Sequence, residues 1–177
     1  MCTVAPVRSR LPCAAILTAL LLAGCGGDDG NKTESKADFV AAADKICLER
    51  DTSASKLGAV QSDADLGRLS RELAAIYQKA IAALESVSLP PGGARAGAET
   101  YVRATVALRA PVQRMTAAST SLQNAAATKS AAKLKEAGRQ LQTSVNTVQA
   151  LGEVADQAAR EYGMRSYGQT GRPLPVS

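Results

Sequence analysis

Apolar residues recur every three or four positions along most of the chain after Ser35, which is the spacing of one face of an α-helix. The chain is rich in alanine, has one phenylalanine and no tryptophan, and shows no run of strand-like alternation. These features favour helix throughout. The clearest stripe passes through Leu66, Leu69, Leu73, Ile76, Ala80, Leu84 and Val87.

Four helical segments are predicted from such stripes. The first places on its inner side Phe39, Ala43, Ile46 and Cys47, and nearer solvent Asp38, Lys45, Glu49 and Arg50. The third has its stripe at Tyr101, Thr105, Leu108, Val112, Met115, Ser119, Leu122 and Ala126. The fourth has its stripe at Leu134, Ala137, Leu141, Val145, Val148, Leu151, Ala155 and Ala158. Because one-faced helices cannot bury their stripes alone, we predict an all-α, elongated antiparallel four-helix bundle over residues 35–168, followed by a disordered tail at 169–177.

Side chains that cap helices indicate where the first two segments begin. Ser35 followed by Asp38 predicts the start of the first helix, because a serine hydroxyl and a nearby carboxylate satisfy free backbone N–H groups. This helix should end around residues 58–61. Ser62 and Asp63 predict the start of the second.

Helix-breaking residues indicate the remaining boundaries. The segment Leu89-Pro90-Pro91-Gly92-Gly93 separates the second helix from a third that starts directly after it. Pro111 predicts a kink near Ala107, because proline removes one backbone hydrogen bond. A short turn is predicted at residues 128–130, and the last helix should end within residues 163–168.

The first 25 residues have the layout of an export signal. Arg8 and Arg10 precede an apolar run, residues 11–23, of about 13 residues, which is short of the roughly 20 that a membrane-spanning helix needs. Two small residues then precede Cys25. The segment Leu22-Ala23-Gly24-Cys25 resembles the lipobox of bacterial lipoprotein precursors, so residues 1–24 are predicted to be a signal peptide.

The lipobox resemblance implies a lipid attachment at Cys25, in the form of a diacylglyceryl group on its sulfur. Two acyl chains, such as palmitate, anchor a protein stably where one chain would be marginal. Residues 25–34 are polar and glycine-rich and are predicted to be a flexible tether. We therefore expect a lipid anchor in the cell membrane, with the bundle on the extracytoplasmic face. An ordinary cleaved leader or an uncleaved anchor is the alternative.

Charge is distributed unevenly along the chain. The net charge is +5, and removal of residues 1–24 lowers it to +3, with −3 on residues 25–91 and +6 on residues 92–177. Residues 94–140 hold only Glu99 and Glu136 against Arg95, Arg103, Arg109, Arg114, Lys129, Lys133, Lys135 and Arg139. Two interpretations stay open: surfaces that complement each other within the fold, or a basic face toward an anionic lipid surface or a cell-wall polymer. Nucleic acid is not expected as a partner of an exported protein.

The few cysteines and the lack of histidine limit the kinds of functional site that this chain can form. With the leader removed and Cys25 acylated, Cys47 is left alone, either as a buried apolar residue or as a partner of a second molecule. The sequence contains no histidine, so neither Glu-x-x-His metal pairs nor a haem attachment motif exists. No nucleophile has a recognisable base. We expect no catalytic, cofactor-binding or metal site, and no enzymatic activity.

The order of short motifs is informative as well: Phe39, Asp44-Lys45-Ile46-Cys47, Leu89-Pro90-Pro91, Tyr101 and residues 163–168. This order resembles that of small exported helical proteins and lipoproteins of high-GC Gram-positive bacteria. In that group a second cysteine stands where this chain has Tyr167, so the disulfide that the resemblance would imply for Cys47 is absent. The resemblance implies a helical plan and an extracytoplasmic address, and no chemistry.

Two functions follow from this sequence. The first is a non-enzymatic, lipid-anchored envelope protein whose bundle serves interaction or spacing. The second is a binding module that holds an apolar or anionic ligand between helices, with the core loosened by Pro111, Thr105 and Ser119. A cavity of several hundred Å3 beside those residues would favour the second function, and a filled core the first. We expect the first. Oligomeric state and orientation on the membrane stay open.

Overall fold

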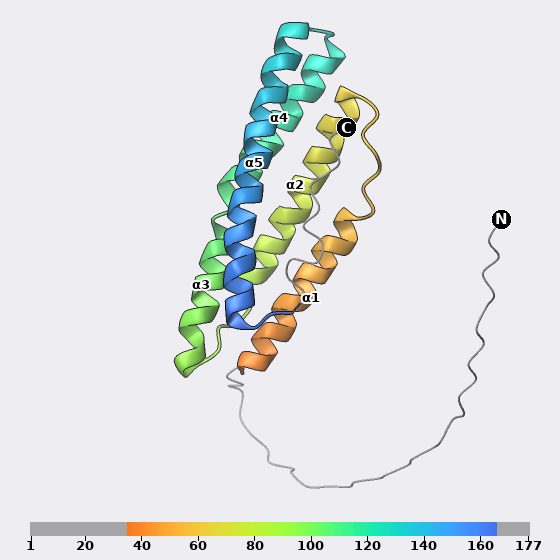
Figure 1. Ribbon diagram of the computed structural model, residues 1–177. Helices are drawn as coiled ribbons and strands as arrows, with labels where there is room; N and C mark the ends of the chain where they lie inside the picture. Colours follow the sequence, from red (N-terminus) through yellow and green to blue (C-terminus); the bar gives the residue numbers. More distant parts are fainter. Residues whose placement is uncertain (1–34, 166–177) are drawn as a thin grey trace, which may run out of the picture. The chain divides into compact units, whose positions relative to one another are not determined.

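The computed structural model describes residues 35–165, and all of its regular elements are helical (Figure 1). They are α1 (Lys36–Ala54), α2 (Asp63–Glu85), the 3-10 turn η1 (Gly92–Ala94), α3 (Arg95–Val106), α4 (Arg109–Ala127) and α5 (Ala131–Tyr162). Helices α3 and α4 follow one another as a broken column, so the fold is an antiparallel four-helix bundle, as predicted. The predicted leader, Cys25, the predicted tether and the predicted tail at residues 169–177 lie outside the described residues.

Both helix starts predicted from serine caps are confirmed. The Asp38 N–H donates to the Ser35 hydroxyl over 3.2 Å, and the Ser35 N–H donates back to the Asp38 carboxylate over 3.0 Å, which forms a capping box. At α2 the Asp65 N–H donates to the Ser62 hydroxyl over 3.1 Å. Helix α1 ends at Ala54, a few residues earlier than the sequence predicts.

The kink predicted from Pro111 is a full break between α3 and α4. Pro111 has no N–H to donate to the carbonyl of Ala107, so the regular hydrogen-bond ladder is interrupted there. Ala107 and Leu108 leave the helix, and the Leu108 N–H donates to the Thr105 carbonyl over 3.1 Å in a tighter, 3-10-like turn. The ladder resumes where the Val112 N–H donates to the Leu108 carbonyl over 3.0 Å. The column formed by α3 and α4 is therefore broken between Val106 and Arg109.

The two ends of α5 define the two ends of the bundle. Before α5, the chain turns through residues 128–130, where Lys129 adopts a left-handed φ of 50°. We call this end the hairpin end. After α5, Gly163 caps the helix with a φ of +97°, a conformation that glycine adopts without steric cost. Lys36 lies over the ring of Tyr162 at 4.6 Å, so α5 finishes beside the beginning of α1. We call this the α1 end.

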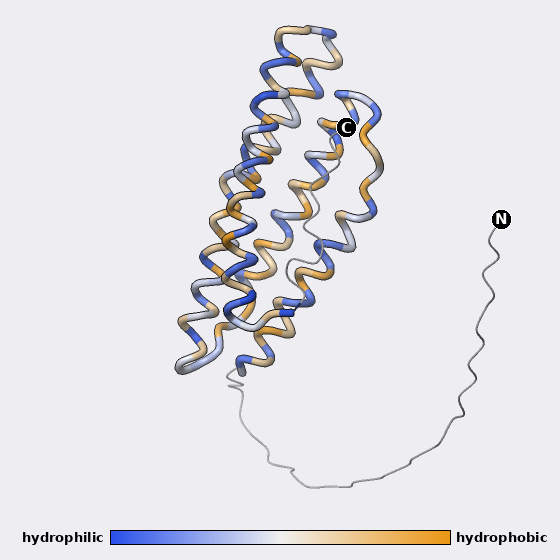
Figure 2. Tube along the Cα trace, viewed as in Figure 1, coloured by the Kyte–Doolittle hydropathy of each residue, from blue (hydrophilic) through white to orange (hydrophobic). Residues whose placement is uncertain are grey.

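The buried residues form two clusters, and in Figure 2 hydrophobic and hydrophilic positions alternate along every helix that contributes to them. The cluster at the α1 end gathers around three rings. Phe39 meets Tyr101 at 6.4 Å and Tyr162 at 5.6 Å, both edge to face. The second cluster fills the space between α2, α4 and α5 and includes Ile81, Met115 and Leu141. Helix α1 contributes buried residues to the first cluster alone.

Helix α2 packs tightly against α4 at Gly67. A Cβ atom at this position would lie 2.7 Å from the Gln123 Cγ and 2.9 Å from the backbone oxygen of Ser119. Any side chain would therefore force the backbone of α4 to move. The absence of a side chain at Gly67 lets the first turns of α2 pack directly on α4.

We predict that Gly67→Ala lowers the free energy of unfolding by about 1–3 kcal/mol, because the added methyl group overpacks the contact with α4. Gly138→Ala is the matched control. It lies inside α5, its Cβ would meet nothing within 4 Å, and it should raise the stability by about 0.5–1 kcal/mol. Denaturant unfolding of both variants, followed by circular dichroism, checks the pair. Equal stabilisation by the two substitutions would contradict the close contact.

Candidate functional site

The described cysteine is buried. Cys47 is 2% exposed on the inner side of α1, and its sulfur lies 3.6 Å from the hydroxyl of Tyr101. A thiol in this place behaves as a small core residue, and another molecule cannot reach it without movement of α1. Cys25, the predicted lipid attachment site, lies outside the described residues.

Acidic and sulfur side chains do not converge in the described part of the chain. Within residues 35–165 no group of three or more cysteine, aspartate or glutamate side chains is arranged to hold a metal ion. In the same range, none of the helices combines the length and the hydropathy needed to span a bilayer.

The core beside the proline break is filled. Thr105, Pro111 and Ser119, the residues expected to loosen it, are all buried. The Thr105 hydroxyl donates to the Tyr101 carbonyl over 3.1 Å, and the Ser119 hydroxyl donates to the Met115 carbonyl over 2.6 Å. Both hydroxyls therefore have a hydrogen-bond acceptor on their own helix. Neither of the two hollows described below is lined by these three side chains.

A charged cluster joins the second half of α1 to α2 and α5. Arg50 pairs with Asp51 over 2.8 Å, and these two side chains are only 15% and 16% exposed. The guanidinium of Arg50 also lies over the ring of Tyr77 at 5.5 Å, a cation–π contact. The prediction that Arg50 lies near solvent is wrong. Its spacing from Ala43 and Cys47, seven and three residues, places it on the inner face.

Asp156 of α5 completes this cluster. Its burial raises the pKa of its carboxyl above the ordinary value, and the neighbouring charges of Arg50 and Arg160 only partly oppose that shift, while Asp51 adds to it. Burial likewise raises the pKa of the Tyr77 phenol. The cluster holds α1 by charge beyond Cys47, the last buried residue of this helix.

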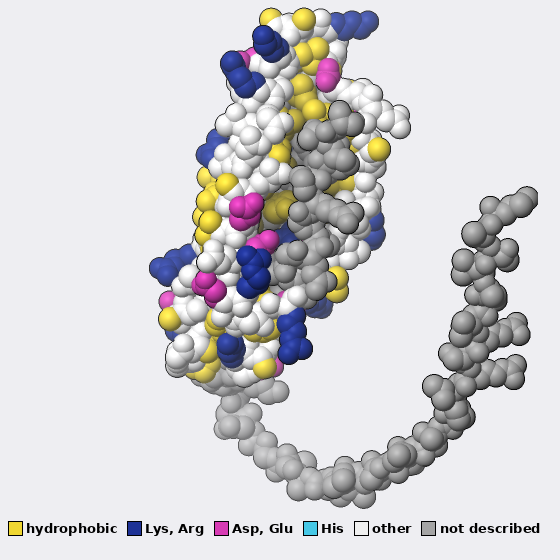
Figure 3. Space-filling view, in the orientation of Figure 1, with side chains coloured by type: hydrophobic (Ala, Val, Ile, Leu, Met, Phe, Trp, Pro, Cys, Tyr) yellow, Lys and Arg dark blue, Asp and Glu magenta, His cyan; other side chains and the backbone are white. Residues whose placement is uncertain are grey.

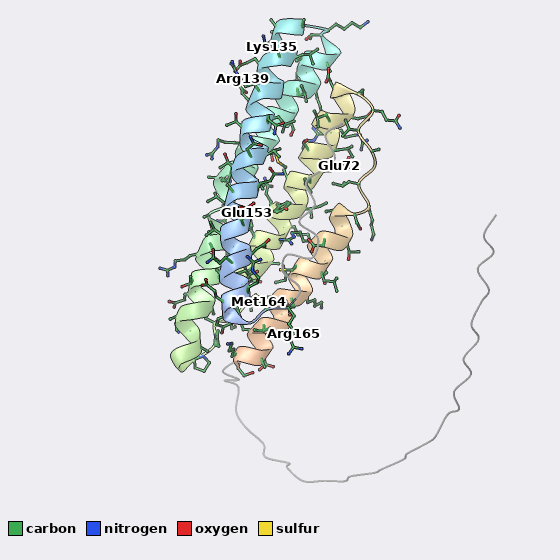
Figure 4. All side chains as sticks on the ribbon, in the orientation of Figure 1. Glu72, Lys135, Arg139, Glu153, Met164 and Arg165 are labelled. Atoms are coloured by element: carbon green, nitrogen blue, oxygen red, sulfur yellow. The ribbon has the colours of Figure 1, made fainter. Side chains whose placement is uncertain are left out.

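The structure divides the basic stretch of residues 94–140 into separate groups. Arg95 pairs with Glu99 on α3, and Arg109 of α4 pairs with Glu85 of α2. Lys129, Lys133, Lys135 and Arg139 gather at the hairpin end, where Figure 3 shows Lys and Arg side chains projecting and Figure 4 labels Lys135 and Arg139. The stretch is therefore not one continuous basic face, and its densest part is this tip.

A hollow of about 500 Å3 lies between α4 and α5 at the same tip. Its polar lining consists of Ser121, Asn124, Thr128, Lys133, Glu136 and Gln140. Within it, the Glu136 carboxylate accepts hydrogen bonds from Arg139 and, over 2.8 Å, from the amide of Gln140. The lysine is exposed, and the remaining polar groups are donors and acceptors suited to a hydrated, polar ligand.

The apolar stripes do not reveal this hollow, but the polar positions beside them carry a signal for it. Ser121, Asn124 and Thr128 are spaced by three and four residues on α4. Lys133, Glu136 and Gln140 repeat that spacing on α5. Two polar stripes on either side of a short turn are brought face to face by the hairpin.

A second, smaller hollow of about 280 Å3 lies between α3 and α5, lined by Gly97, Thr100 and Tyr162 among others. The Tyr162 ring packs against Gly97, where a Cβ would lie 2.6 Å from the ring. The Tyr162 hydroxyl is buried without a hydrogen-bond partner within the described structure. Burial raises the pKa of this phenol.

Comparisons with known proteins yield no match to a protein-family profile, to a curated protein or to a solved structure. The assignment of a function therefore depends on the residues and geometry described above.

We predict that Asp156→Asn stabilises the protein above about pH 5 by a few tenths of a kcal/mol, since solvent screens this partly exposed group. A carboxyl whose folded-state pKa is raised contributes stability below its unfolded pKa and loses it as the pH rises. The gain should therefore disappear near pH 3. Denaturant unfolding across this pH range decides; a gain that persists at pH 3 would contradict the role of ionisation.

We predict that Tyr162→Phe raises the free energy of unfolding by about 1 kcal/mol, because it removes a buried hydroxyl that has lost its water without a replacement. It should also reduce the loss of stability above about pH 10, where the unfolded chain ionises more readily than the buried phenol. Tyr101→Phe is the matched control. It removes a hydroxyl that contacts Cys47 and should destabilise by about 0.5–1.5 kcal/mol. Thermal unfolding of both variants checks the opposite signs.

Proposed function

We propose that this chain is a lipid-anchored envelope protein whose helical bundle serves interaction or spacing on the extracytoplasmic side of the cell membrane, without enzymatic activity. The observation that carries the proposal is the segment Leu22-Ala23-Gly24-Cys25 behind a short apolar run. The bundle that follows it has a defined polarity, because the chain enters at the α1 end and the hairpin lies at the other end.

The dimensions of the bundle suit a spacer. The 32 residues of α5 make the helix about 48 Å long, and it runs from the hairpin end to the α1 end. The ten residues from Cys25 to Glu34 span at most about 35 Å when fully extended. A lipid on Cys25 would therefore keep the α1 end close to the membrane and leave the hairpin end free to reach outward.

The use of buried polar groups supports interaction rather than catalysis. The hydroxyls of Thr105, Ser119 and Ser144 each donate to a carbonyl of their own helix. None of these three is left to act as a nucleophile or to hold a ligand in the core. The polar groups that remain accessible lie on the surface, and they are densest at the hairpin end.

The decisive experiment is the replacement Cys25→Ala in the full chain expressed in a bacterium. Loss of the sulfur removes the attachment point, so we expect the protein to leave the membrane fraction or to accumulate as an uncut, unacylated precursor. Cell fractionation and intact-mass spectrometry measure both results. Cys47→Ala is the matched control and should stay in the membrane fraction, because Cys47 is buried in the fold. A mature, membrane-bound Cys25→Ala protein would contradict the proposal.

A further inference from the structure

The basic tip at the hairpin end is defined here as Lys129, Lys133, Lys135 and Arg139. Within residues 121–140 these four basic side chains stand against the single carboxylate of Glu136. Glu136 is already paired with Arg139, and the three lysines are exposed. The tip therefore presents a surplus of positive charge, in the form of flexible ammonium groups, to whatever lies beyond the bundle.

The first turns of α2 lower this surplus by one charge and do not cancel it, because residues 63–72 hold Asp63, Asp65 and Glu72 against Arg68 and Arg71. Asp65 and Glu72 pair with Arg68 over 3.3 Å and 3.0 Å, so both carboxylates already have a partner on their own helix. The first turn of α5 contains no acidic residue, and Lys133 lies in it. The positive end of the α5 dipole and the lysines thus act in the same direction.

The hollow between α4 and α5 makes part of this charged surface concave. Lys133 lines it together with Asn124, Ser121 and Gln140, whose side chains can donate hydrogen bonds. Lysine ammonium groups bind phosphates as point charges, without the fixed bidentate geometry that a guanidinium group imposes on a phosphate or a carboxylate. Charge, donors and a groove open to solvent suit a segment of a hydrated, phosphate-bearing chain.

We propose that the basic tip and its hollow bind a phosphate-bearing polymer of the cell wall. The proposal rests on the proposed function, since it takes the α1 end as the membrane side. The tip then lies about 48 Å from that end, the length of α5. Lipid headgroups attract basic residues only within a Debye length of about 8–10 Å. A site for headgroups would therefore be expected at the α1 end, where the charges are nearly balanced.

Binding is tested with the full chain purified in detergent and poly(glycerol phosphate) as the probe. The variant Lys129→Gln/Lys133→Gln/Lys135→Gln should weaken binding at least about tenfold at low salt, because contacts with a polyanion are lost. Lys45→Gln/Lys56→Gln/Lys79→Gln is the matched control: it removes the same charge from three exposed lysines outside the tip and should leave the affinity within about twofold. Circular dichroism of each variant verifies the fold.

The part played by the hollow is tested by one charge change. Asn124→Asp places a carboxylate in the hollow and should weaken binding of the same probe about threefold or more. Gln113→Glu adds the same charge at an exposed position elsewhere on α4 and should have less than half that effect. Equal effects of the two substitutions would overturn a site in the hollow.

A second experiment tests whether lipid occupies the tip. The acylated chain in phosphatidylcholine vesicles is treated with an amine-labelling reagent, and the labelling of each lysine is measured by mass spectrometry. Poly(glycerol phosphate) should protect the tip lysines and leave Lys45, Lys56 and Lys79 reactive. Phosphatidylglycerol added to the vesicles should leave the tip reactive. Protection of the tip by this lipid, equal losses in both triple variants, or no binding by the parent chain would each overturn the proposal.

The two proposals fail in different measurements. The detergent assay measures polymer binding at the tip and does not depend on attachment to a membrane. The fractionation of Cys25→Ala measures attachment to the membrane and does not depend on the tip. An unanchored chain that still binds the polymer through its lysines would leave the tip site intact and remove the anchor alone. An anchored chain that does not bind the polymer would leave the proposed anchor intact and remove the tip site alone.

Discussion

The meeting of three aromatic rings at the α1 end is the contact on which the arrangement of this bundle depends. Phe39 is fully buried between Tyr101 and Tyr162, and it brings α1, α3 and α5 together. Helix α1 contributes no buried residue to the second cluster. Without these rings, α1 would be held to the bundle mainly by the smaller Ala43 and Cys47 and by the charged cluster around Arg50. The packing of the first half of α1 thus depends on one apolar contact.

Small residues and surface charge have separate tasks in this molecule. Glycine and alanine let the helices approach closely, as Gly67 does against α4, so the interior is filled and the described hollows lie at its surface. The hydroxyls of Thr105, Ser119 and Ser144 donate to carbonyls of their own helices, whereas the buried hydroxyl of Tyr162 has no partner within the described structure. This separation leaves recognition to the surface, where the hairpin collects lysines at the end farthest from the start of α1.

Most of the fold was predictable from the sequence, because helix boundaries depend on local chemistry. Ser35, Ser62 and Gly163 cap helices through bonds to backbone a few residues away, and Pro111 breaks one for the same local reason. The position of Arg50 was missed because a charged residue was assigned to solvent by type, although its spacing follows the inner stripe. The candidate site was predicted less well, because a stretch of basic residues along a sequence does not indicate which of them meet.

The sequence by itself determined the helical class, the four segments, a kink at Pro111 and the features that predict export and acylation at Cys25. Each of these depends on neighbours within a few residues, or on composition. The tertiary structure alone decided that the core beside Thr105 and Ser119 is filled, that Arg50 and Asp156 meet, and that the basic stretch is divided. These features join residues far apart in the chain, so they exist only once the apolar stripes have packed and set which faces turn toward solvent.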